Sequence, residues 1–435
     1  MSTTARTDRI VPSDRTSRHA PGSRISSLAF AAMAALGLCS AAQAQEPIKL
    51  GILLTHVGPT AIFARYEDKG ARMRIDEVNR AGGIKGRRIE VIGYDTEGKP
   101  DRAGTLFRRL AQEDKVSAVI GPDSIYVLLG MSSVPTESKV FSMAAPGNYE
   151  LVPMKDRQWV ASAWTANGYT MVLGLAWLKD KLRVGRVGML TTADSIGEMI
   201  GREATDTAKM LGMEMVQVLA QPASDRDLLP SLTKLNGMKP GIEGLVVFGS
   251  GPYGTIAMNQ TDLAGVNVPI LYIGGNIIPE LIKDVTPETG KRTFLTVARN
   301  VVADTLPASD PYIAAAKKFN ADYQAKYKET PTQPSAVGYD MASTVIDAIE
   351  NVGSDPVKIR DYIYTKQKDF PMAQGIRTNR TPSDAYGIDP RDVVVASIEG
   401  GRFVFKGYLK DSYKALGIKD EAITEQMRRF KMLAD

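Results

Sequence analysis

The hydrophobic and polar positions of residues 48–275 follow two patterns that alternate along the chain. Short apolar runs such as 49–54 are typical of buried strands. Between them, apolar positions recur every three or four residues, which is typical of amphipathic helices. After Pro100, which suits the first turn of a helix, the apolar positions 103, 106, 107, 110 and 111 form one such face. The pattern therefore predicts strands and helices in alternation.

This alternation predicts an α/β fold with parallel sheets, right-handed crossovers and helices on both sheet faces. The expected strands are 49–54, 88–95, 116–121, 140–141, 186–190, 214–219, 244–248 and 269–274. The expected helices among them are 60–81, one from Pro100, 125–138, 168–181, 196–211, 226–236 and 254–264. The last third adds helices at 310–328, 337–350 and 355–366, and a strand-turn-strand stretch at 391–407.

We expect two doubly wound parallel-sheet lobes, joined by a hinge whose segments cross more than once. The N-terminal lobe is expected to comprise residues 45–165 and 299–374. The C-terminal lobe is expected to comprise residues 166–298 and 375–435.

The N-terminal segment has the features of a secretory signal peptide. Residues 25–38 are apolar but too few to span a bilayer, arginines precede them, and the small-x-small sequence Ala42-Gln43-Ala44 follows. We expect residues 1–44 to be removed and the product to be exported to the periplasm. Two alternatives are a buried core helix and a lipid anchor on Cys39, although Leu38 is larger than lipid-attachment signals usually accept.

Charge and cysteine content exclude several functional classes for the remaining chain. The formal charge of +5 falls to about +2 without the leader, because residues 1–44 hold five arginines and two aspartates. No basic run supports nucleic-acid binding, and no later apolar run is long enough for a membrane span. Cys39 is the only cysteine, so disulfides within the mature chain are not expected. A soluble exported protein is the prediction.

Ligands of open parallel sheets bind outside the carboxyl ends of the strands, and this rule selects the loops to consider. Those loops are rich in Gly, Pro, Ser, Thr and Asn, and they bring backbone N–H groups close to a ligand. Ordinary turn chemistry between strand and helix is the alternative for each one. The selected loops are 55–60, 121–124, 144–148, 191–195, 249–253 and 274–276, the first of which contains His56.

Several strings along the chain resemble those of a known family. They are Gly51-Ile-Leu-Leu-Thr, Asn79-Arg-Ala-Gly-Gly-Ile-Lys-Gly86, Asp95, Val119-Ile-Gly-Pro122, and Ser-Ala-Val-Gly-Tyr-Asp-Met-Ala at 335–342. The chain resembles type I periplasmic binding proteins of the branched-chain amino acid and amide family, which serve ATP-driven importers. The resemblance covers residues 45–435 and implies that two lobes close around a small ligand.

The resemblance also implies a position for the ligand carboxylate. Family members hold it with a Ser after the Gly-Pro-type loop and with groups of the next strand's loop, which fall here on Ser124, Ala145, Gly147 and Asn148. Ser124 is expected at the start of a helix, where its hydroxyl either binds the ligand or only caps that helix.

The second lobe departs from the family pattern. Asp194-Ser195-Ile-Gly stands where an Asp-x-Tyr-Gly string is frequent, and the loop after 269–274 offers Asn276 rather than an acid. A ligand ammonium would then lack an obvious anion, which is costly in a dry cleft. The interpretation favours a carboxylate or amide ligand without an α-amino group. An aromatic ligand would suit the candidate stacking residues Tyr149, Trp164 and Tyr253, each of which is otherwise a core residue.

Enzymatic alternatives have weaker support in the sequence. Gly249-Ser-Gly-Pro-Tyr-Gly254 matches a dinucleotide fingerprint, but no acid ends the next strand and Pro252 removes one N–H group. His56 is the only histidine after the leader, so hydrolase and zinc sites lack their usual residues. We expect no catalysis, cofactor or metal. The prediction is a monomeric solute-binding protein that delivers its ligand to the permease of an ABC importer; a ligand sensor for a membrane receptor is the alternative.

Overall fold

The structure is a computed structural model that describes residues 46–58, 60–249, 252–275, 277–389 and 392–432. The predicted signal peptide lies outside the described residues. Residues from Pro47 onward form one compact unit built on two main sheets. Among the described residues, no helix is long and apolar enough to span a membrane.

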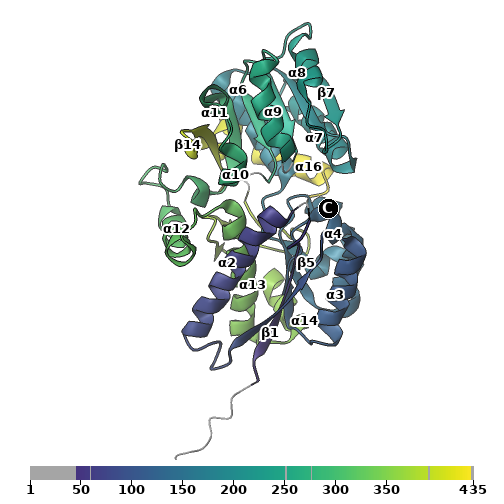
Figure 1. Ribbon diagram of the computed structural model, residues 1–435, viewed down its shortest axis with the longest axis vertical. Helices are drawn as coiled ribbons and strands as arrows, with labels where there is room; N and C mark the ends of the chain where they lie inside the picture. Colours follow the sequence, from purple (N-terminus) through teal and green to yellow (C-terminus); the bar gives the residue numbers. More distant parts are fainter. Residues whose placement is uncertain (1–45, 59, 250–251, 276, 390–391, 433–435) are drawn as a thin grey trace, which may run out of the picture. The chain divides into compact units, whose positions relative to one another are not determined.

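The first sheet has five parallel strands in the order β2-β1-β3-β4-β5 (Figure 1). Its strands are β1 (Ile48–Leu54), β2 (Ile89–Asp95), β3 (Ala118–Ile120), β4 (Phe141–Ala144) and β5 (Val160–Ser162). The intervening helices are α2 (Ala61–Arg80), α3 (Pro100–Gln112), α4 (Ile125–Met131) and α5 (Ser133–Ser138), followed by the 3₁₀ turns η1 (Tyr149–Leu151) and η2 (Met154–Trp159).

The second sheet has seven strands in the order β14-β13-β10-β9-β8-β6-β7, of which the last five are parallel. Its strands are β6 (Arg186–Thr192), β7 (Glu214–Gln221), β8 (Gly244–Phe248), β9 (Ile270–Ile273), β10 (Thr293–Val297), β13 (Val394–Glu399) and β14 (Arg402–Tyr408). The helices that accompany it are α6 (Asn167–Leu182), α7 (Ser195–Met210), α8 (Leu229–Asn236), α9 (Pro252–Leu263), α10 (Pro279–Ile282), α11 (Pro287–Arg292), α15 (Leu409–Ala415) and α16 (Asp420–Arg429).

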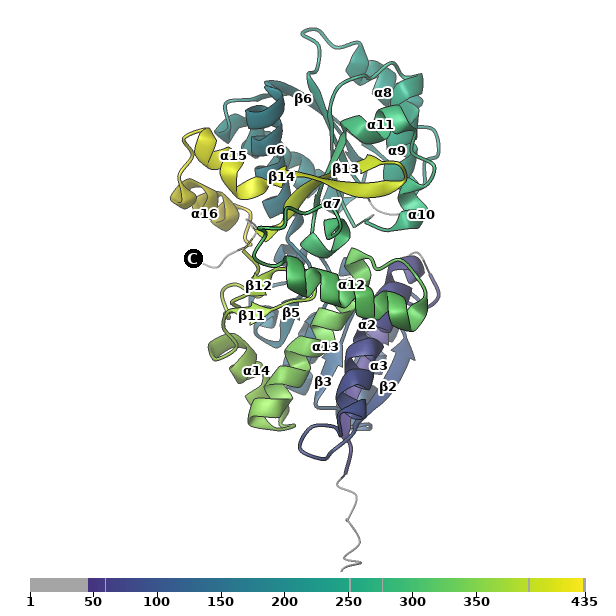
Figure 2. The same ribbon diagram turned by 90° about the vertical axis from the view of Figure 1, so that its left-hand side faces the viewer.

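The chain passes between the two sheets three times (Figure 2). It leaves the first sheet after β5, returns after β10, and crosses again before β13. The returning segment holds η3 (Arg299–Val302), α12 (Ile313–Tyr327), α13 (Gln333–Val352), α14 (Pro356–Thr365), β11 (Phe370–Pro371) and β12 (Arg377–Thr378). The predicted α/β class with two parallel-sheet lobes is therefore confirmed, while the exact lobe boundaries stay a prediction.

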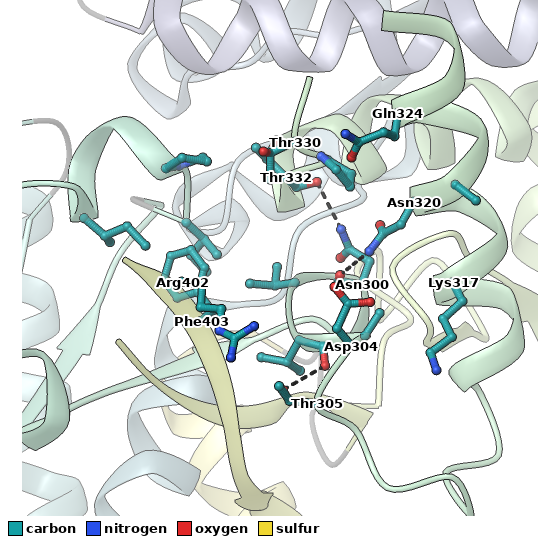
Figure 3. Close-up of a pocket in the computed structure, with 18 of the residues that line it drawn as sticks. Asn300, Asp304, Thr305, Lys317, Asn320, Gln324, Thr330, Thr332, Arg402 and Phe403 are labelled. Carbon is teal, nitrogen blue, oxygen red and sulfur yellow. Dashed lines mark hydrogen bonds between the residues drawn. The ribbon is translucent and has the colours of Figure 1, made fainter. Parts of the chain in front are cut away.

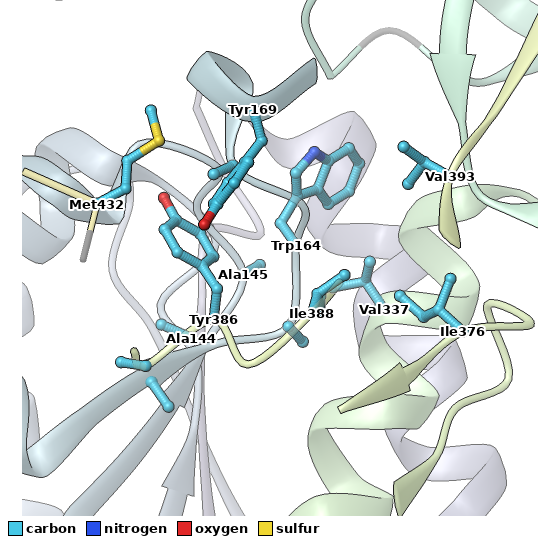
Figure 4. Packing of buried hydrophobic residues seen from close by; sticks show 14 of the residues in the cluster. Ala144, Ala145, Trp164, Tyr169, Val337, Ile376, Tyr386, Ile388, Val393 and Met432 are labelled. Atoms are coloured by element: carbon cyan, nitrogen blue, oxygen red, sulfur yellow. The ribbon is translucent and has the colours of Figure 1, made fainter. Parts of the chain in front are cut away.

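Helix α13 packs tightly against α2 beside the first sheet. Two glycines permit this approach, since a Cβ at Gly70 would lie 1.9 Å from the Ser335 carbonyl oxygen and one at Gly338 would lie 1.9 Å from that of Glu67. The core beneath includes residues of both sheets, and Figure 4 shows Trp164 and Tyr169 in the same buried cluster as Val337 of α13. The backbone of α2 is thus fixed where it carries Glu67.

The sequence pattern missed several short elements. The expected helix 125–138 is two helices, because Pro135 has no N–H group to continue the ladder from α4. Strand β5 has three residues, and α10 and α11 have four and six, which is too short for periodicity to register. The C-terminal helices α15 and α16 were not predicted either.

Candidate functional site

A cavity of about 150 Å³ lies at the carboxyl ends of β3 and β4. It is formed by the loops after these strands, by the first turns of α2 and by the segment before α6. The lining residues are Thr60, Phe63, Glu67, Asp123, Ser124, Ile125, Tyr126, Ala145, Pro146, Gly147, Asn148, Trp164, Asn167 and Gly275. Five predicted site residues therefore line one cavity: Ser124, Ala145, Gly147, Asn148 and Trp164.

The loop after β3 is fixed by its backbone. Gly121 has a φ of +116°, and a Cβ there would lie 2.0 Å from the Leu53 carbonyl oxygen, so only glycine fits. The Ser142 hydroxyl donates a 2.6 Å hydrogen bond to the Gly121 carbonyl. These constraints hold the next residues of the loop in place at the cavity.

Ser124 is the residue before α4 and has an extended backbone, as a helix N-cap does. Its side chain nevertheless makes no capping hydrogen bond to the described amides of α4. Ser124 is 8% exposed and lines the cavity. The side chain of Ser124 is therefore not used as a helix cap, and its role in ligand binding stays a prediction.

The loop after β4 contributes backbone atoms to the cavity wall, and the Asn148 side chain in this loop takes part in two hydrogen bonds. The Ala145 N–H donates to the Pro122 carbonyl, which ties this loop to the one after β3. A Cβ at Gly147 would lie 2.8 Å from Trp164 Cδ1, so glycine lets the backbone approach the indole. Asn148 Oδ1 accepts a 2.7 Å hydrogen bond from Asn167, and its Nδ2 donates to Glu150. Asn148 is thus held as part of the wall.

Trp164, Phe63 and Tyr126 are the aromatic residues among those that line the cavity. Trp164 is 9% exposed and packs at the edge of the main core cluster. Large, rigid rings such as these favour apolar or aromatic ligand groups through area burial and stacking. Trp164 lines the cavity, and its stacking role stays a prediction.

The carboxyl groups of Glu67 and Asp123 also line the cavity, and the sequence analysis selected neither of them. Thr60, Phe63 and Glu67 are spaced by three and four residues, which places them on one face of α2. Glu67 is 3% exposed, and its Oε2 has no hydrogen-bond partner among the described residues. Burial raises the pKa of Glu67 well above its usual value, and the charge of Asp123 adds to the rise.

Asp123 is the second carboxyl group. Its Oδ1 accepts the Thr55 N–H at 2.8 Å and its Oδ2 accepts the Thr60 hydroxyl at 2.5 Å. Burial raises the pKa of Asp123, while these hydrogen bonds oppose the rise. The sequence analysis looked for acids only in the second lobe, whereas these two acids belong to the first; whether the ligand carries an ammonium group stays a prediction. A signal existed in the sequence, since Asp123 belongs to the very loop that was selected for Ser124.

Four other predicted site residues do not line this cavity. Tyr253 is fully buried in the core of the second sheet, where its hydroxyl donates to the Thr191 carbonyl. Asp194 caps α7 by accepting the Ile196 and Gly197 N–H groups, and Ser195 beside it is exposed. His56 is exposed in the loop after β1. The side chain of Tyr149 and all of Asn276 lie outside the described residues.

A larger groove of about 930 Å³ lies beside α12 (Figure 3). Asn300, Asp304 and Asn320 line it, together with Arg402 and Phe403 of β14. The Asn320 amide donates to the Asn300 carbonyl and the Asn300 amide to the Thr332 carbonyl. None of the described residues in the loops after β3 and β4 lines this groove, so the smaller cavity is the better candidate site.

The described residues hold no group of three or more His, Cys, Asp or Glu side chains arranged for a metal ion. The dinucleotide-like string after β8 includes Ser250 and Gly251, which lie outside the described residues. Pro252, which the sequence analysis noted as a lost donor, begins α9.

Comparison with known proteins finds amino acid binding proteins among the relatives of this chain. A Leu-, Ile-, Val-, Thr- and Ala-binding protein of Pseudomonas aeruginosa is 23% identical over 83% of this chain and 91% of its own length. A Leu/Ile/Val-binding protein of Escherichia coli is 23% identical over 75% of this chain and 85% of its own length.

Solved structures share the fold. A branched-chain amino acid binding protein of Streptococcus pneumoniae, in complex with isoleucine, has a TM-score of 0.71 at 24% identity and covers 83% of this chain and 99% of its own. A solute-binding protein of Rhodopseudomonas palustris, in complex with benzoate, has a TM-score of 0.69 at 18% identity over 83% and 96%. The family model described as periplasmic binding protein matches residues 47–386. The chain therefore belongs to the periplasmic binding protein family, as its sequence motifs indicated.

Proposed function

We propose that this chain captures a small carboxylate-bearing ligand in the cavity at β3 and β4 and delivers it to the permease of an ABC importer. The observation that carries the proposal is the position of Ser124, a residue that lines the cavity and whose side chain does not cap its helix. A hydroxyl held in this way can donate to a ligand carboxylate, and a charge-assisted bond of this kind contributes about 1.5–3 kcal/mol.

The relatives support a carboxylate ligand. The Pseudomonas and Escherichia proteins are named for the amino acids that they bind, and the two solved complexes hold isoleucine and benzoate. These ligands differ in their side chains but all carry a carboxylate. A Ser124 hydroxyl can donate a hydrogen bond to the carboxylate that these ligands share.

The dimensions of the cavity limit the ligand. A dry protein cavity of about 150 Å³ is large enough for benzene, and this cavity has the same volume. Trp164 and Phe63 provide the apolar surface for such a group. We expect a ligand with one small ring or one short branched chain attached to its carboxylate.

Contacts between the lobes support a closing motion around the ligand. The Tyr126 hydroxyl of the first lobe donates to Asp194 at the start of α7, and Tyr66 of α2 donates to Glu280 of α10 at 2.6 Å. Closure of this kind buries a ligand and presents a surface that exists only in the loaded state. We propose that the permease recognises this state and that the protein itself catalyses no reaction on its ligand.

The experiment is a thermal-shift screen of the protein without residues 1–44 against aliphatic, aromatic and amino carboxylates, followed by calorimetric titration. We expect at least one carboxylate to bind with 1:1 stoichiometry and to be recovered unchanged. Product accumulation that follows protein concentration through repurification would contradict a binding function. The absence of binding by every carboxylate, with folded protein, would contradict the ligand class.

A further inference from the structure

We propose that the groove beside α12 is the surface on which the permease docks, and that it accepts an acidic, extended loop of that permease. The inference rests on the proposed function, since it assigns a surface to the partner that receives the ligand. It goes further by naming the walls of that surface and the charge of the segment that fits it.

The groove lies where the two lobes meet. One wall is α12, which packs on α2 of the first lobe through Phe319 and Tyr323, and the other walls are α10 and β14 of the second lobe. Gly275 lines the cavity at β3 and β4, whereas Ile277, two residues later, lines the groove. A partner in the groove therefore contacts both lobes and a segment that also borders the proposed ligand.

Three cations line the groove, and none of them has an ion pair among the described residues. They are Lys317 and Lys328 on the α12 side and Arg402 on β14, and all three are exposed. Figure 3 shows Lys317 and Arg402 at opposite sides of the groove with Asp304 between them. Asp304 is the one acid among the described lining residues, so positive charge prevails in the groove.

The other lysines of the same helix are neutralised. Lys318 pairs with Asp322 at 2.5 Å and Lys326 pairs with Asp76 at 2.5 Å, and neither lysine lines the groove. The cations of α12 are thus left without acids only on the side that faces the groove. Unpaired charges at a surface attract a partner of opposite charge and fix its register, which here requires acidic residues in the partner.

The remaining lining residues suit a polypeptide segment. Pro279, Val301 and Phe403 are half-buried and offer apolar surface to a side chain. Gln324 and Thr330 are exposed, and their side chains can form hydrogen bonds with a peptide backbone. A pocket for a small ligand encloses most of that ligand, whereas this groove carries its polar and charged groups on exposed residues. A loop that enters the groove can reach the cations and the apolar surface together.

The first test identifies the partner by cross-linking in the native host. p-Benzoylphenylalanine replaces Gln324 in the exported chain, the carboxylate that binds best is supplied, and cross-linked peptides are sequenced by mass spectrometry. We expect a cross-link to a periplasmic loop of the permease that contains Asp or Glu. The control places the same cross-linker at Leu263 of α9, which is 75% exposed and is not among the described lining residues, and it should not give this product.

The second test measures the contribution of the cations. The loaded protein is titrated against the purified permease in nanodiscs at about 50 and about 300 mM NaCl. The triple variant Lys317→Gln, Lys328→Gln, Arg402→Gln should raise the dissociation constant by about fivefold or more at low salt and lose most of the salt dependence. Its affinity for the carboxylate should change by less than about twofold, because none of the three residues lines the cavity at β3 and β4.

The triple variant Lys318→Gln, Lys326→Gln, Lys410→Gln is the matched control. It removes the same charge from lysines that are exposed and are not among the described lining residues. Its dissociation constant for the permease should stay within about twofold of that of the unsubstituted protein.

The docking surface is overturned if both triple variants bind the permease equally well, or if Gln324 gives no cross-link to the permease. A cross-link to a second copy of this chain, or the same loss of binding on nanodiscs that hold anionic lipid without permease, also overturns it. If the loaded, unsubstituted protein does not bind the permease at all, delivery to an importer fails and the surface fails with it, whereas carboxylate binding in solution would still support ligand capture.

Discussion

The hydroxyl group of Tyr126 donates a 3.1 Å hydrogen bond to Oδ2 of Asp194, and this bond joins the two lobes beside the cavity at β3 and β4. The same Asp194 caps α7 through its other oxygen, Oδ1, so the acceptor is held in place. Burial raises the pKa of Tyr126 to about 12, with the charge of Asp194 adding to the rise, so the phenol remains a donor at neutral pH. The hydrogen bond therefore connects α4 of the first lobe to the start of α7 in the second.

Tyr126→Phe should weaken ligand binding by about two- to tenfold, because one hydrogen bond contributes roughly 0.5–1.5 kcal/mol. The loss should appear mainly as faster ligand dissociation, since the bond exists only when the lobes are together. Stopped-flow dissociation measurements test this expectation. Tyr94→Phe is the control, because its hydroxyl donates to Asp114 outside the described cavity wall. Unchanged dissociation in the Tyr126 variant would show that this bond does not hold the lobes.

The contact between α2 and α13 predicts a large stability effect. In Gly338→Ala the new methyl group would meet the Glu67 carbonyl oxygen at 1.9 Å, so the helices must separate. Overpacking of this kind costs about 1–3 kcal/mol or more, and thermal unfolding should show a clearly lower melting temperature. Gly237→Ala is the control, because a Cβ there meets no heavy atom closer than 3.5 Å. Equal melting temperatures for the two variants would contradict the packing described.

The parallel sheets could be predicted because long apolar strands and helical faces each leave a strong periodic signal. Part of the cavity wall was selected by the same reasoning, because the loops with Ser124 and Asn148 follow parallel strands, whose carboxyl ends meet at one edge of the sheet. Glu67 could not be found in this way. A single acid within an amphipathic helix normally faces solvent, and only the tertiary placement of α2 over the strand ends turns it inward. Tyr253 was expected in the site but lies in the core of the second sheet. An aromatic side chain after a strand gains more free energy by burial in the core than by facing a cavity.

The buried acid Glu203 predicts how stability depends on pH. Burial raises the pKa of Glu203 to about 9, and the charge of nearby Glu150 adds to the rise. The folded state therefore holds a proton that the unfolded state releases above about pH 4.3, so the free energy of unfolding should decrease as the pH rises from about 5 to 9. The slope from one such proton is at most about 1.4 kcal/mol per pH unit.

Glu203→Gln removes this titration and should flatten the pH dependence measured by chemical denaturation. Glu198→Gln, on the exposed side of α7, serves as the control and should keep the slope of the unsubstituted protein. A variant at Glu203 that retains the full slope would assign the pH dependence to other groups, such as Glu150, whose pKa burial raises to about 7.

Processing of the leader gives a prediction outside the described residues. Intact-mass spectrometry of the protein exported by its native host should give an N-terminus at or near Gln45, because cleavage is expected after Ala42-Gln43-Ala44. Chains that retain residues 1–44, or that carry a lipid on Cys39, would contradict release into the periplasm.

The central claim is that the cavity at β3 and β4 binds the ligand through Ser124. Calorimetric titration of Ser124→Ala with the carboxylate that binds best tests it most directly. Loss of one charge-assisted bond of about 1.5–3 kcal/mol should raise the dissociation constant roughly ten- to a hundredfold. The melting temperature should change little, because Ser124 makes no capping bond. Ser133→Ala, whose hydroxyl donates to Glu137, is the control and should bind normally. An unchanged dissociation constant together with a lowered melting temperature would show that Ser124 is structural and that the ligand binds elsewhere.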